Sequence, residues 1–401
     1  MKHISMTSQI CSGCRACASV CSKNAISFMP DSEGFLIPNI DDVLCIECGL
    51  CVKTCPALTP KEIEQDYSHK AFALQYHDEN VRKNSASGAL FPAFANYFIN
   101  SLHGYVCGCI LDENLIAKHI VSNQWSQVLR MQDSKYVQSD MSSCVNEIVA
   151  LLRAGKYVLF TGTSCQVKGL HSALETKRVD ATKLLTIDFF CHGVPSPMIW
   201  SDYVRTFEQK NGQKIEGYKF RNKTYGWGKG NAARGTSFLS TWLYKGKCHE
   251  KSSLLARIWP RIFFSNLCLR LYCHSCPYTK VDKPADITMG DFWGVEQFRP
   301  NFDDHQGCSL AITHCEKAEK ILKELSNVEL LEVSIDEVIK RQSNAFAPSK
   351  PHHLRDEFWR DYANNGFEYL LPKYFCYTGK GRLKAFMKYV LFKLHLRQYS
   401  Y

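Results

Sequence analysis

The sequence lacks any long apolar segment. No hydrophobic run among its 401 residues approaches the ~18 residues needed to cross a bilayer, so no membrane-spanning helix is expected. The first residues, MKHISMTSQICSGC, contain no apolar stretch before the first cysteines, so we expect no secretory signal. With 45% hydrophobic and 22% charged residues, the composition is that of a soluble globular protein, and we expect it in the cytoplasm.

Acidic residues are missing from the end of the chain. The last 22 residues carry six basic side chains, and the whole chain has a net charge of +10. Arginine-rich runs and aromatic RNA-binding signatures are also absent, so nucleic acid is not an expected partner. One helical stripe is apolar and contains Leu383, Phe386, Met387, Val390, Leu391 and Leu394. Such a basic amphipathic helix makes peripheral membrane contact, docks a partner or packs on its own core, and we favour packing.

Cysteine, in contrast, is abundant, with 20 residues. Thiols in a reducing cytoplasm rarely form structural disulfides, so this excess indicates metal or redox chemistry. Two segments, CSGCRACASVC and CIECGLCVKTCP, share the spacing Cys-x2-Cys-x2-Cys-x3-Cys. In this pattern three cysteines of one segment bind one 4Fe-4S cluster, and the fourth cysteine binds the other cluster.

The spacing assigns four ligands to each of two 4Fe-4S clusters. The first set is Cys11, Cys14, Cys17 and Cys55, and the second is Cys45, Cys48, Cys51 and Cys21. Zinc is the alternative, but zinc motifs usually present two Cys-x2-Cys pairs separated by a longer loop. Pro56 follows the second segment as expected, whereas Ser22 replaces the proline after the first. Residues 1–60 are therefore predicted to form an α+β ferredoxin-like domain that transfers single electrons.

The rest of the chain alternates apolar strands with amphipathic helices, which predicts a larger α/β domain with a largely parallel central sheet. Strands are expected at Lys70–Tyr76, Gly104–Leu111, Tyr157–Phe160, Leu184–Phe190 and Asp286–Gly290, and helices at Ser87–Asn100 and Asn146–Ala154. We divide the chain into a linker at 61–70, a core in two parts at 71–150 and 151–335, and an extension at 336–401 that contains the basic helix.

Four further cysteines lie where functional groups gather in such sheets. Cys165 and Cys191 each come just after a predicted strand, and Cys273 and Cys276 form a Cys-x2-Cys pair. These four suit one more 4Fe-4S cluster. A nucleophilic Cys165 with His192 as its base, a redox disulfide in the CHSCP pair, and four buried thiols are the alternatives. Cys268 lies close to the pair and is the least secure of the cysteines interpreted as packing residues.

Seven segments together identify a family. SASGALF, SKYVQS, VLFTGTSCQVKGL, DFFCHGVPSP, FRNKTYGWG, YCHSCPYT and DITMGDFWG occur in this order, and the chain resembles the coenzyme F-420 hydrogenase/dehydrogenase beta-subunit family. The resemblance implies bound FAD, a third cluster at the four core cysteines, and two-electron chemistry at the flavin with single electrons passing through the clusters. Ala89 and Ser164 depart from the family, which has glycine and proline there.

The same segments supply candidate flavin contacts. Ser87, Gly88 and Ala89 begin a helix whose free N–H groups suit the flavin pyrophosphate, although Ser85 or Ser87 would also serve as an ordinary N-cap. Further candidates are Ser134, Lys135, Gly162 and Thr163. A lone lysine such as Lys135 is otherwise usually a solvated surface group.

Two residues are candidates for catalysis. His192 would move a proton, although a satisfied structural histidine is the interpretation we favour. Asp291 follows a strand where an active-site carboxylate would lie, or it caps the next turn. Arg221 and Lys223 suit a loop that clamps an anionic substrate, or a plain surface loop.

The resulting hypothesis is an FAD-dependent iron–sulfur oxidoreductase. Its expected partners are ferredoxin or another redox protein, and a small organic substrate such as coenzyme F-420 or another unsaturated molecule. A non-catalytic electron-transfer subunit is the main alternative, and a cluster-based redox sensor without flavin is a third.

Overall fold

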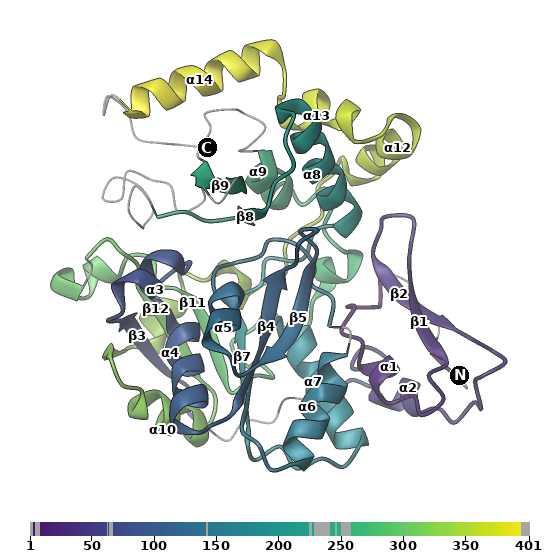
Figure 1. The fold of residues 1–401 in the computed structure, drawn as a ribbon, viewed down its shortest axis with the longest axis vertical. Coiled ribbons are helices and arrows are strands. Elements are labelled where there is room, and N and C mark those ends of the chain that lie inside the picture. Colours follow the sequence, from purple (N-terminus) through teal and green to yellow (C-terminus); the bar gives the residue numbers. More distant parts are fainter. Residues whose placement is uncertain are drawn as a thin grey trace.

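The computed structural model describes every residue except 1–2, 5–8, 62, 64–66, 142, 224–226, 228–240, 245–246, 250–257, 303 and 394–401. Three regions are visible: a small N-terminal domain, a large sheet flanked by helices, and a mainly helical region (Figure 1). Among the described residues, no helix is both long and apolar enough to cross a membrane.

The N-terminal domain contains two short helices and a hairpin. The helices are α1 (Ala16–Ser19) and α2 (Leu50–Thr54), and strands β1 (Ile26–Pro30) and β2 (Leu36–Ile40) pair antiparallel. Each helix lies inside one cysteine segment and follows a residue in the left-handed region, Arg15 with φ 59° or Gly49 with φ 72°. The two copies of the sequence pattern therefore give the same local structure twice.

The central sheet has eight strands in the described part of the chain. In spatial order they are β13 (Val328–Val333), β3 (Lys70–Tyr76), β12 (Ser309–Thr313), β11 (Ile287–Asp291), β7 (Leu184–Phe189), β6 (Val158–Thr161), β4 (Tyr105–Leu111) and β5 (Ala117–Ser122). Only β11, β7, β6 and β4 are mutually parallel, and the outer strands pair antiparallel. The link between β4 and β5, residues 112–116, is too short for the crossover that parallel strands need. The predicted parallel sheet is correct for the centre alone.

Most predicted strands and helices are present, and their ends lie within one or two residues of the predicted ends. The helix expected at Ser87–Asn100 is shorter at its start: α4 (Leu90–Asn96) is followed by a π-helical turn at Tyr97–Ser101. Its N-cap is Ala89, with φ 66° and no side-chain cap, so neither Ser85 nor Ser87 is the N-cap. The left-handed backbone at Ala89 explains why glycine suits this position.

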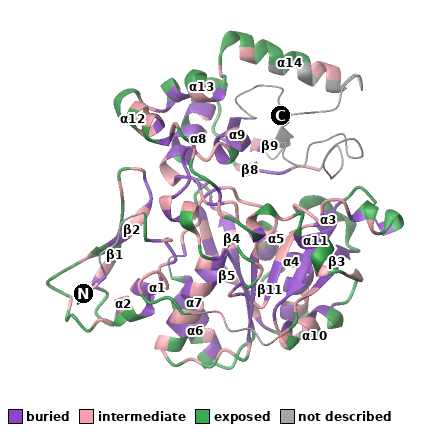
Figure 2. Cartoon of the chain, turned by 180° about the vertical axis from the view of Figure 1, so that it is seen from behind, coloured by how far each residue is buried: buried purple, intermediate pink, exposed green. Residues whose placement is uncertain are grey.

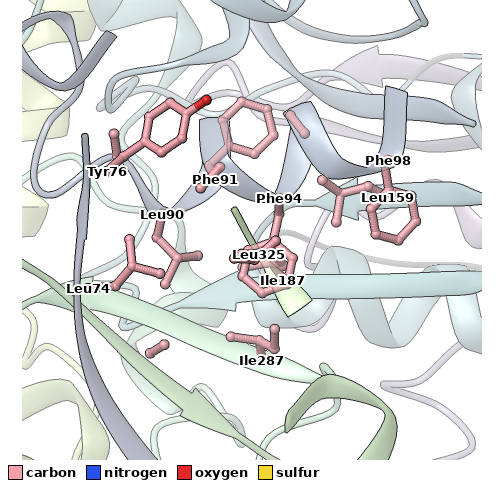
Figure 3. Packing of buried hydrophobic residues seen from close by; sticks show 14 of the residues in the cluster. Leu74, Tyr76, Leu90, Phe91, Phe94, Phe98, Leu159, Ile187, Ile287 and Leu325 are labelled. Carbon is pink, nitrogen blue, oxygen red and sulfur yellow. The ribbon is translucent and has the colours of Figure 1, made fainter. Parts of the chain in front are cut away.

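Helices cover both faces of the sheet. On one face, α4, α5 (Trp125–Met131) and α10 (Glu316–Glu324) pack on side chains such as Leu159 and Ile187 (Figure 3). On the other, α6 (Cys144–Arg153) and α7 (Ser164–Thr176) pack on Val158 and Phe160. Because neighbouring residues of β6 point to opposite faces, both layers are buried, as Figure 2 shows.

The remaining helices form an aromatic-rich region. It contains α8 (Pro197–Asn211), α9 (Ile258–Phe264), α12 (Arg355–Asn365) and α13 (Phe367–Phe375), with strands β8 (Gly217–Lys219), β9 (Thr241–Tyr244) and β10 (Lys247–His249). Cys268 is buried in this cluster, which supports its interpretation as a packing residue. The shorter helices α3 (Glu79–Asn84) and α11 (Ile335–Ile339) flank β3.

The basic helix is α14 (Gly379–Lys393). Leu383, Phe386 and Met387 of its apolar stripe are 61%, 53% and 56% exposed, so the prediction that this stripe packs on the core is wrong for these three residues. Leu394 lies outside the described residues.

Candidate functional site

Cysteines from both N-terminal segments meet at one buried position, the inner set. Its members are Cys11, Cys14, Cys17 and Cys55, all nearly inaccessible to solvent. Burial, together with the neighbouring Cys11 and Cys55 thiols, raises the pKa of Cys14 to about 12, against a backbone hydrogen bond from Ala16. Burial and the thiols of Cys14, Cys11 and Cys55 also raise the pKa of Cys17. The sequence assigned these four residues to one cluster.

The other four N-terminal cysteines, the outer set, line a pocket at the surface. The pocket encloses about 400 Å³ of empty space, part of it open to solvent, and is lined by Cys21, Cys45, Cys48 and Cys51. Ile46 and Leu50 also line it and expose much of their apolar surface. Cys48 is itself exposed. The second predicted ligand set therefore surrounds a single space that opens outward.

The four core cysteines also converge. Cys165 is the second residue of α7, Cys191 follows β7, and Cys273 lies in the short 3-10 helix Leu271–Ser275. Burial raises the pKa of Cys191 to about 12, and the thiols of Cys165 and Cys276 add to this effect. Burial, Cys191, Cys165 and Cys276 raise the pKa of Cys273 as well. Four thiols from three separate chain segments thus lie within electrostatic reach of one another.

The inner set lies directly against the core set. Helix α7, which carries Cys165, packs on α1 and α2. A methyl group at Gly169 would come within 2.8 Å of the Cys14 Sγ atom, so glycine is required for this contact. The Cys165 thiol contributes to the raised pKa of Cys14, and the thiols of both raise the pKa of Tyr272 and Tyr278 after the dominant effect of burial. The two tyrosines therefore lie close to both sets.

These thiols fit iron–sulfur clusters by their chemistry. Within the described residues, no group of three or more His, Cys, Asp or Glu side chains is arranged to hold a single metal ion. A cuboidal cluster makes a different demand, because each thiolate binds a separate iron at its own corner. Burial and mutual repulsion both disfavour four free thiolates, and bound iron supplies the compensating positive charge.

A buried arginine joins the N-terminal domain to the core. Arg270 is fully buried and donates from Nε to the Cys11 carbonyl oxygen (2.5 Å) and from Nη2 to the Leu36 carbonyl oxygen (3.0 Å). Its Nη1 atom donates to Gln138 Oε1 at 3.0 Å. Its positive charge also lowers the pKa of Cys165, against the larger effect of burial. Sequence reasoning missed Arg270, although it lies three residues before Cys273.

The first predicted flavin contacts are packed tightly. A Cβ atom at Gly88 would lie 2.2 Å from the Leu74 carbonyl oxygen and 2.5 Å from the Ser309 nitrogen, so the sheet itself requires this glycine. Ser87 donates to the Cys308 carbonyl oxygen at 2.6 Å. Ala89 is buried.

The other predicted flavin contacts have structural partners. The Lys135 ammonium donates to the carbonyl oxygens of Met131 (2.9 Å) and Gln132 (2.6 Å) at the end of α5, so it is not a solvated surface group. Thr163 is the N-cap of α7 in a capping box, with its N–H donated to Gln166 Oε1 at 2.9 Å. Thr163 Oγ1 also lies 3.1 Å from Cys165 Sγ.

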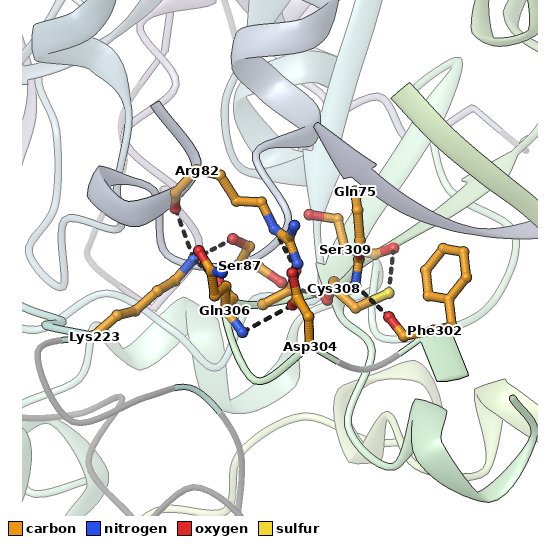
Figure 4. Close-up of polar contacts among 10 residues, drawn as sticks. Gln75, Arg82, Ser87, Lys223, Phe302, Asp304, Gln306, Cys308 and Ser309 are labelled. Carbon is orange, nitrogen blue, oxygen red and sulfur yellow. Dashed lines mark hydrogen bonds and ion pairs between the residues drawn. The ribbon is translucent and has the colours of Figure 1, made fainter. Parts of the chain in front are cut away.

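Two cationic side chains, Lys223 and Arg82, lie near Ser87, and Arg82 forms an ion pair with Asp304 (Figure 4). The Lys223 ammonium donates to the carbonyl oxygens of Arg82 (2.8 Å), Ser87 and Gln306 (2.7 Å). Burial, together with the charges of Arg221 and Arg82, lowers the pKa of Lys223 to about 7, whereas Asp291 and Asp133 oppose this shift. An anion at this position would relieve that repulsion.

Arg221 and Asp291 form a buried ion pair. Arg221 Nη1 donates to both carboxylate oxygens of Asp291, at 3.0 and 2.9 Å, and the guanidinium lies 5.6 Å from the Trp293 ring centroid. The alternative of a plain surface loop is therefore wrong at Arg221, because its side chain is buried. Asp291 ends β11 beside it, at the carboxyl edge of the parallel strands.

His192 has a partner at each ring nitrogen. Nε2 lies 2.7 Å from Asn266 Oδ1, and Nδ1 lies 3.1 Å from Ser349 Oγ. Burial lowers its pKa, although Asn266 opposes this effect. These contacts favour the structural interpretation of His192 over a catalytic one.

Comparison with known proteins agrees with the cysteine patterns. Residues 10–58 match the 4Fe-4S dicluster domain. Residues 155–337 match the family described as the C terminus of the coenzyme F420 hydrogenase/dehydrogenase beta subunit. No curated protein matches the chain. Among solved structures, it is similar to a chain of the F420-reducing NiFe hydrogenase complex from Methanosarcina barkeri, with 17% identity and a TM-score of 0.47, over 71% of this chain and 90% of that one. Residues 155–337 therefore belong to the C-terminal part of the coenzyme F420 hydrogenase/dehydrogenase beta-subunit family, and residues 10–58 form a 4Fe-4S dicluster domain.

Proposed function

We propose that the protein is an iron–sulfur flavoprotein that exchanges single electrons with a redox protein and two electrons with an organic substrate. The N-terminal domain would be of the ferredoxin type, with one 4Fe-4S cluster at the inner set and one at the outer set. A third would be held by Cys165, Cys191, Cys273 and Cys276. When bound, the clusters supply one-electron steps and FAD supplies a two-electron step.

The contact between Cys14 and Gly169 of α7, the helix that carries Cys165 at its start, supports this proposal. The outer set opens to solvent, the inner set is buried, and the inner set touches the helix that begins at the core set. The three sets therefore lie in series from the surface to the carboxyl edge of the sheet. That order is what a relay between a redox protein and a buried cofactor requires.

The outer set also has a surface on which a redox partner would dock. Ile46 and Leu50 line the pocket beside Cys48, and Val43 and Leu44, just before Cys45 in the chain, are also exposed; these four residues are called the outer apolar patch. A small electron-transfer protein such as a ferredoxin fits this position, because its own cofactor would come close to the outer set. Apolar residues beside a redox centre suit a transient interface.

FAD would bind along the carboxyl edge of the parallel strands. The segment that contains Ser87, Gly88 and Ala89 lies beside Arg82, Arg221 and Lys223, and their positive charge suits the pyrophosphate. Ser134 and Lys135 lie near the same charges, because Asp133 interacts with Lys135 and Arg221. Gly162 and Thr163 would extend the site toward Cys165.

Asp291 would position the substrate or flavin through its pair with Arg221, at the end of β11. We assign no proton transfer to His192, because both of its ring nitrogens already have partners. Coenzyme F420 is the first substrate to test, since the matching family is named for hydrogenases and dehydrogenases of this coenzyme.

A second candidate function is electron transfer without substrate turnover. The matching family is described as a beta subunit, so the chain could work only within a larger assembly. Assay of the purified chain with reduced viologen and candidate acceptors separates the two functions. Turnover by the chain alone supports the enzyme, whereas turnover only with a copurifying partner supports the electron-transfer role.

Anaerobic purification with iron, sulfide and flavin analysis tests the proposal. Three 4Fe-4S clusters require about twelve irons per chain, and the proposal also requires one FAD per chain. About eight irons and no flavin would refute both the core cluster and the flavoprotein. The variant Cys191→Ser should lower the iron content to about eight while the N-terminal clusters remain.

A further inference from the structure

A row of polar side chains runs through the sheet from the surface to the core cysteines. Its members, from outside inward, are Asp282, His69, His314, Thr288 and Asp188. The Asp282 side chain is 55% exposed, whereas Asp188 and Thr288 are completely buried. None of these residues has a role in the function proposed above.

Each neighbour in the row is within hydrogen-bond distance of the next. Asp282 Oδ1 lies 2.7 Å from His69 Nε2, and His69 Nδ1 lies 3.1 Å from His314 Nδ1. His314 Nε2 lies 2.8 Å from Thr288 Oγ1, which lies 2.6 Å from Asp188 Oδ1. The row is continuous.

The strand order explains why residues far apart in sequence form this row. His69 immediately precedes β3 and His314 immediately follows β12, and the adjacent residues Lys70 and Thr313 are paired across those strands. Thr288 of β11 is paired with Asp188 of β7. The strands β3, β12, β11 and β7 are consecutive neighbours in the sheet. The row therefore crosses four strands in their spatial order.

The inner end of the row reaches the turn that carries Cys165. Ser164, the residue before it, donates to Asp188 Oδ2 at 2.5 Å. The buried Lys283 ammonium lies 3.2 Å from Ser164 Oγ and 3.9 Å from Asp188 Oδ2. Asp188 precedes Cys191 by three residues.

The hydrogen bonds allow two arrangements with the same number of mobile protons. In one, Asp188 is protonated, Thr288 donates to His314 Nε2, His314 Nδ1 donates to His69 Nδ1, and His69 Nε2 donates to Asp282. In the other, Asp188 is ionised, Thr288 donates to it, His314 donates from Nε2, and His69 donates from both nitrogens. Four protons are present in each, so a shift between them moves one proton equivalent between Asp188 and His69, which lies within hydrogen-bond distance of the exposed Asp282.

The surroundings of His314 favour the passage of a proton through its ring over the retention of a proton on it. Burial lowers the pKa of His314 to about 3, with help from the charges of His69 and Lys283, whereas Asp282 and Asp286 oppose the shift. His314 is therefore neutral at physiological pH and passes a proton by changing tautomer. Burial raises the pKa of Asp188, against Lys283, Ser164 and Thr288.

We propose that Asp282, His69, His314, Thr288 and Asp188 form a proton path between solvent and the core redox site. This inference rests on the proposed function. Hydride transfer to an organic substrate consumes two electrons and one proton for each product anion. The electrons come from the redox partner, and the proton enters at Asp282 while another leaves Asp188 toward Ser164.

The variant His69→Ala tests the path, because it opens a gap near the surface that added imidazole can fill. The holoprotein is reduced with viologen in weakly buffered solution, and cluster bleaching and proton uptake are followed separately with a pH-indicator dye. We expect cluster bleaching at the wild-type rate, proton uptake slowed by at least about tenfold, and recovery with imidazole. His119→Ala removes another buried histidine of the same sheet and should leave proton uptake unchanged.

Unchanged proton uptake in His69→Ala, or slow uptake that imidazole does not restore, would overturn the path. A second measurement does not need flavin: exchange of the His314 ring N–H with D₂O, followed by NMR of 15N-histidine-labelled protein. The path predicts fast exchange in the wild type and slow exchange in His69→Phe, and slow exchange in both would refute it. Absence of iron and flavin at the core would instead refute the proposed function, and the exchange experiment would still decide the path.

Discussion

The inner and outer cysteine sets come from the same sequence spacing but meet different surroundings. Cys14 of the inner set is buried against Gly169 of α7, whereas Cys48 of the outer set is exposed beside an apolar patch. Each set takes three cysteines from one segment and the fourth from the other. The repeat thus brings together two equivalent sets of four thiols, and contacts with the rest of the chain bury one of them.

This difference assigns distinct tasks to two sites that look alike in sequence. An exposed site suits exchange with a partner, and a buried site beside Cys165 suits transfer into the core. Changes at the inner set should therefore affect every electron donor. Changes at the outer set should affect mainly protein donors, because a small dye can approach other sites directly.

The largest effect is expected from Cys14→Ser. Loss of a ligand to the inner cluster should reduce the rate of flavin reduction by at least about 100-fold with both viologen and a protein donor. Stopped-flow absorbance of the flavin measures this rate. Cys48→Ser should slow reduction by the protein donor far more than reduction by viologen. Cys376→Ser, at an exposed cysteine outside all three sets, is the control. If Cys14→Ser and Cys48→Ser slowed flavin reduction by the same factor with both donors, the inner and outer sets would not have the distinct tasks described above.

A large effect on stability is expected from Arg270→Ala. The substitution leaves two backbone carbonyl oxygens and Gln138 without their donor at a buried interface, so we expect a loss of about 3 kcal/mol in the free energy of unfolding. Denaturant unfolding measures it, with the exposed Arg299→Ala as control. A loss near zero would mean that this arginine does not hold the inner set to the core.

An intermediate effect is expected from pH on flavin binding. Burial, with Arg221 and Arg82, lowers the pKa of Lys223 to about 7, and a bound pyrophosphate favours the charged form and so raises that pKa. Above pH 7 the free protein must therefore take up a proton when FAD binds, and its affinity should fall about tenfold per pH unit. Below pH 7 this dependence vanishes. Fluorescence titration of the flavin-free protein measures it. A slope that persists in Lys223→Met would assign it to another group.

The smallest effect is expected from Ile46→Glu in the outer apolar patch. A charge there should raise the KM for a protein donor about fivefold, the usual effect of losing one useful contact at an interface. The rate with viologen should not change. An equal effect on both donors would place the damage in the outer cluster rather than in partner docking.

The sequence predicted the local elements and both N-terminal cysteine sets because spacing alone determines them. It also predicted that Cys165 and Cys191 each follow a strand, and the structure shows that these strands, β6 and β7, are neighbours. It could not predict the antiparallel outer strands, because the pairing of β3 with β12 and β13 depends on distant segments. For the same reason it missed Arg270 and the row from Asp282 to Asp188, whose members are separated by up to 245 residues at the contact of His69 with His314. Lys135 looked available for a cofactor, but its carbonyl partners arise from the end of α5.

Electron paramagnetic resonance of the fully reduced protein tests the central claim most directly. Because Cys14 and Cys165 lie on contacting elements, unpaired spins at the inner and core sets should interact, and the wild-type spectrum should contain a broadened, coupled signal. Cys165→Ser should remove this interaction and leave the signals of the two N-terminal clusters. A reduced wild-type spectrum identical to that of Cys165→Ser would contradict the account.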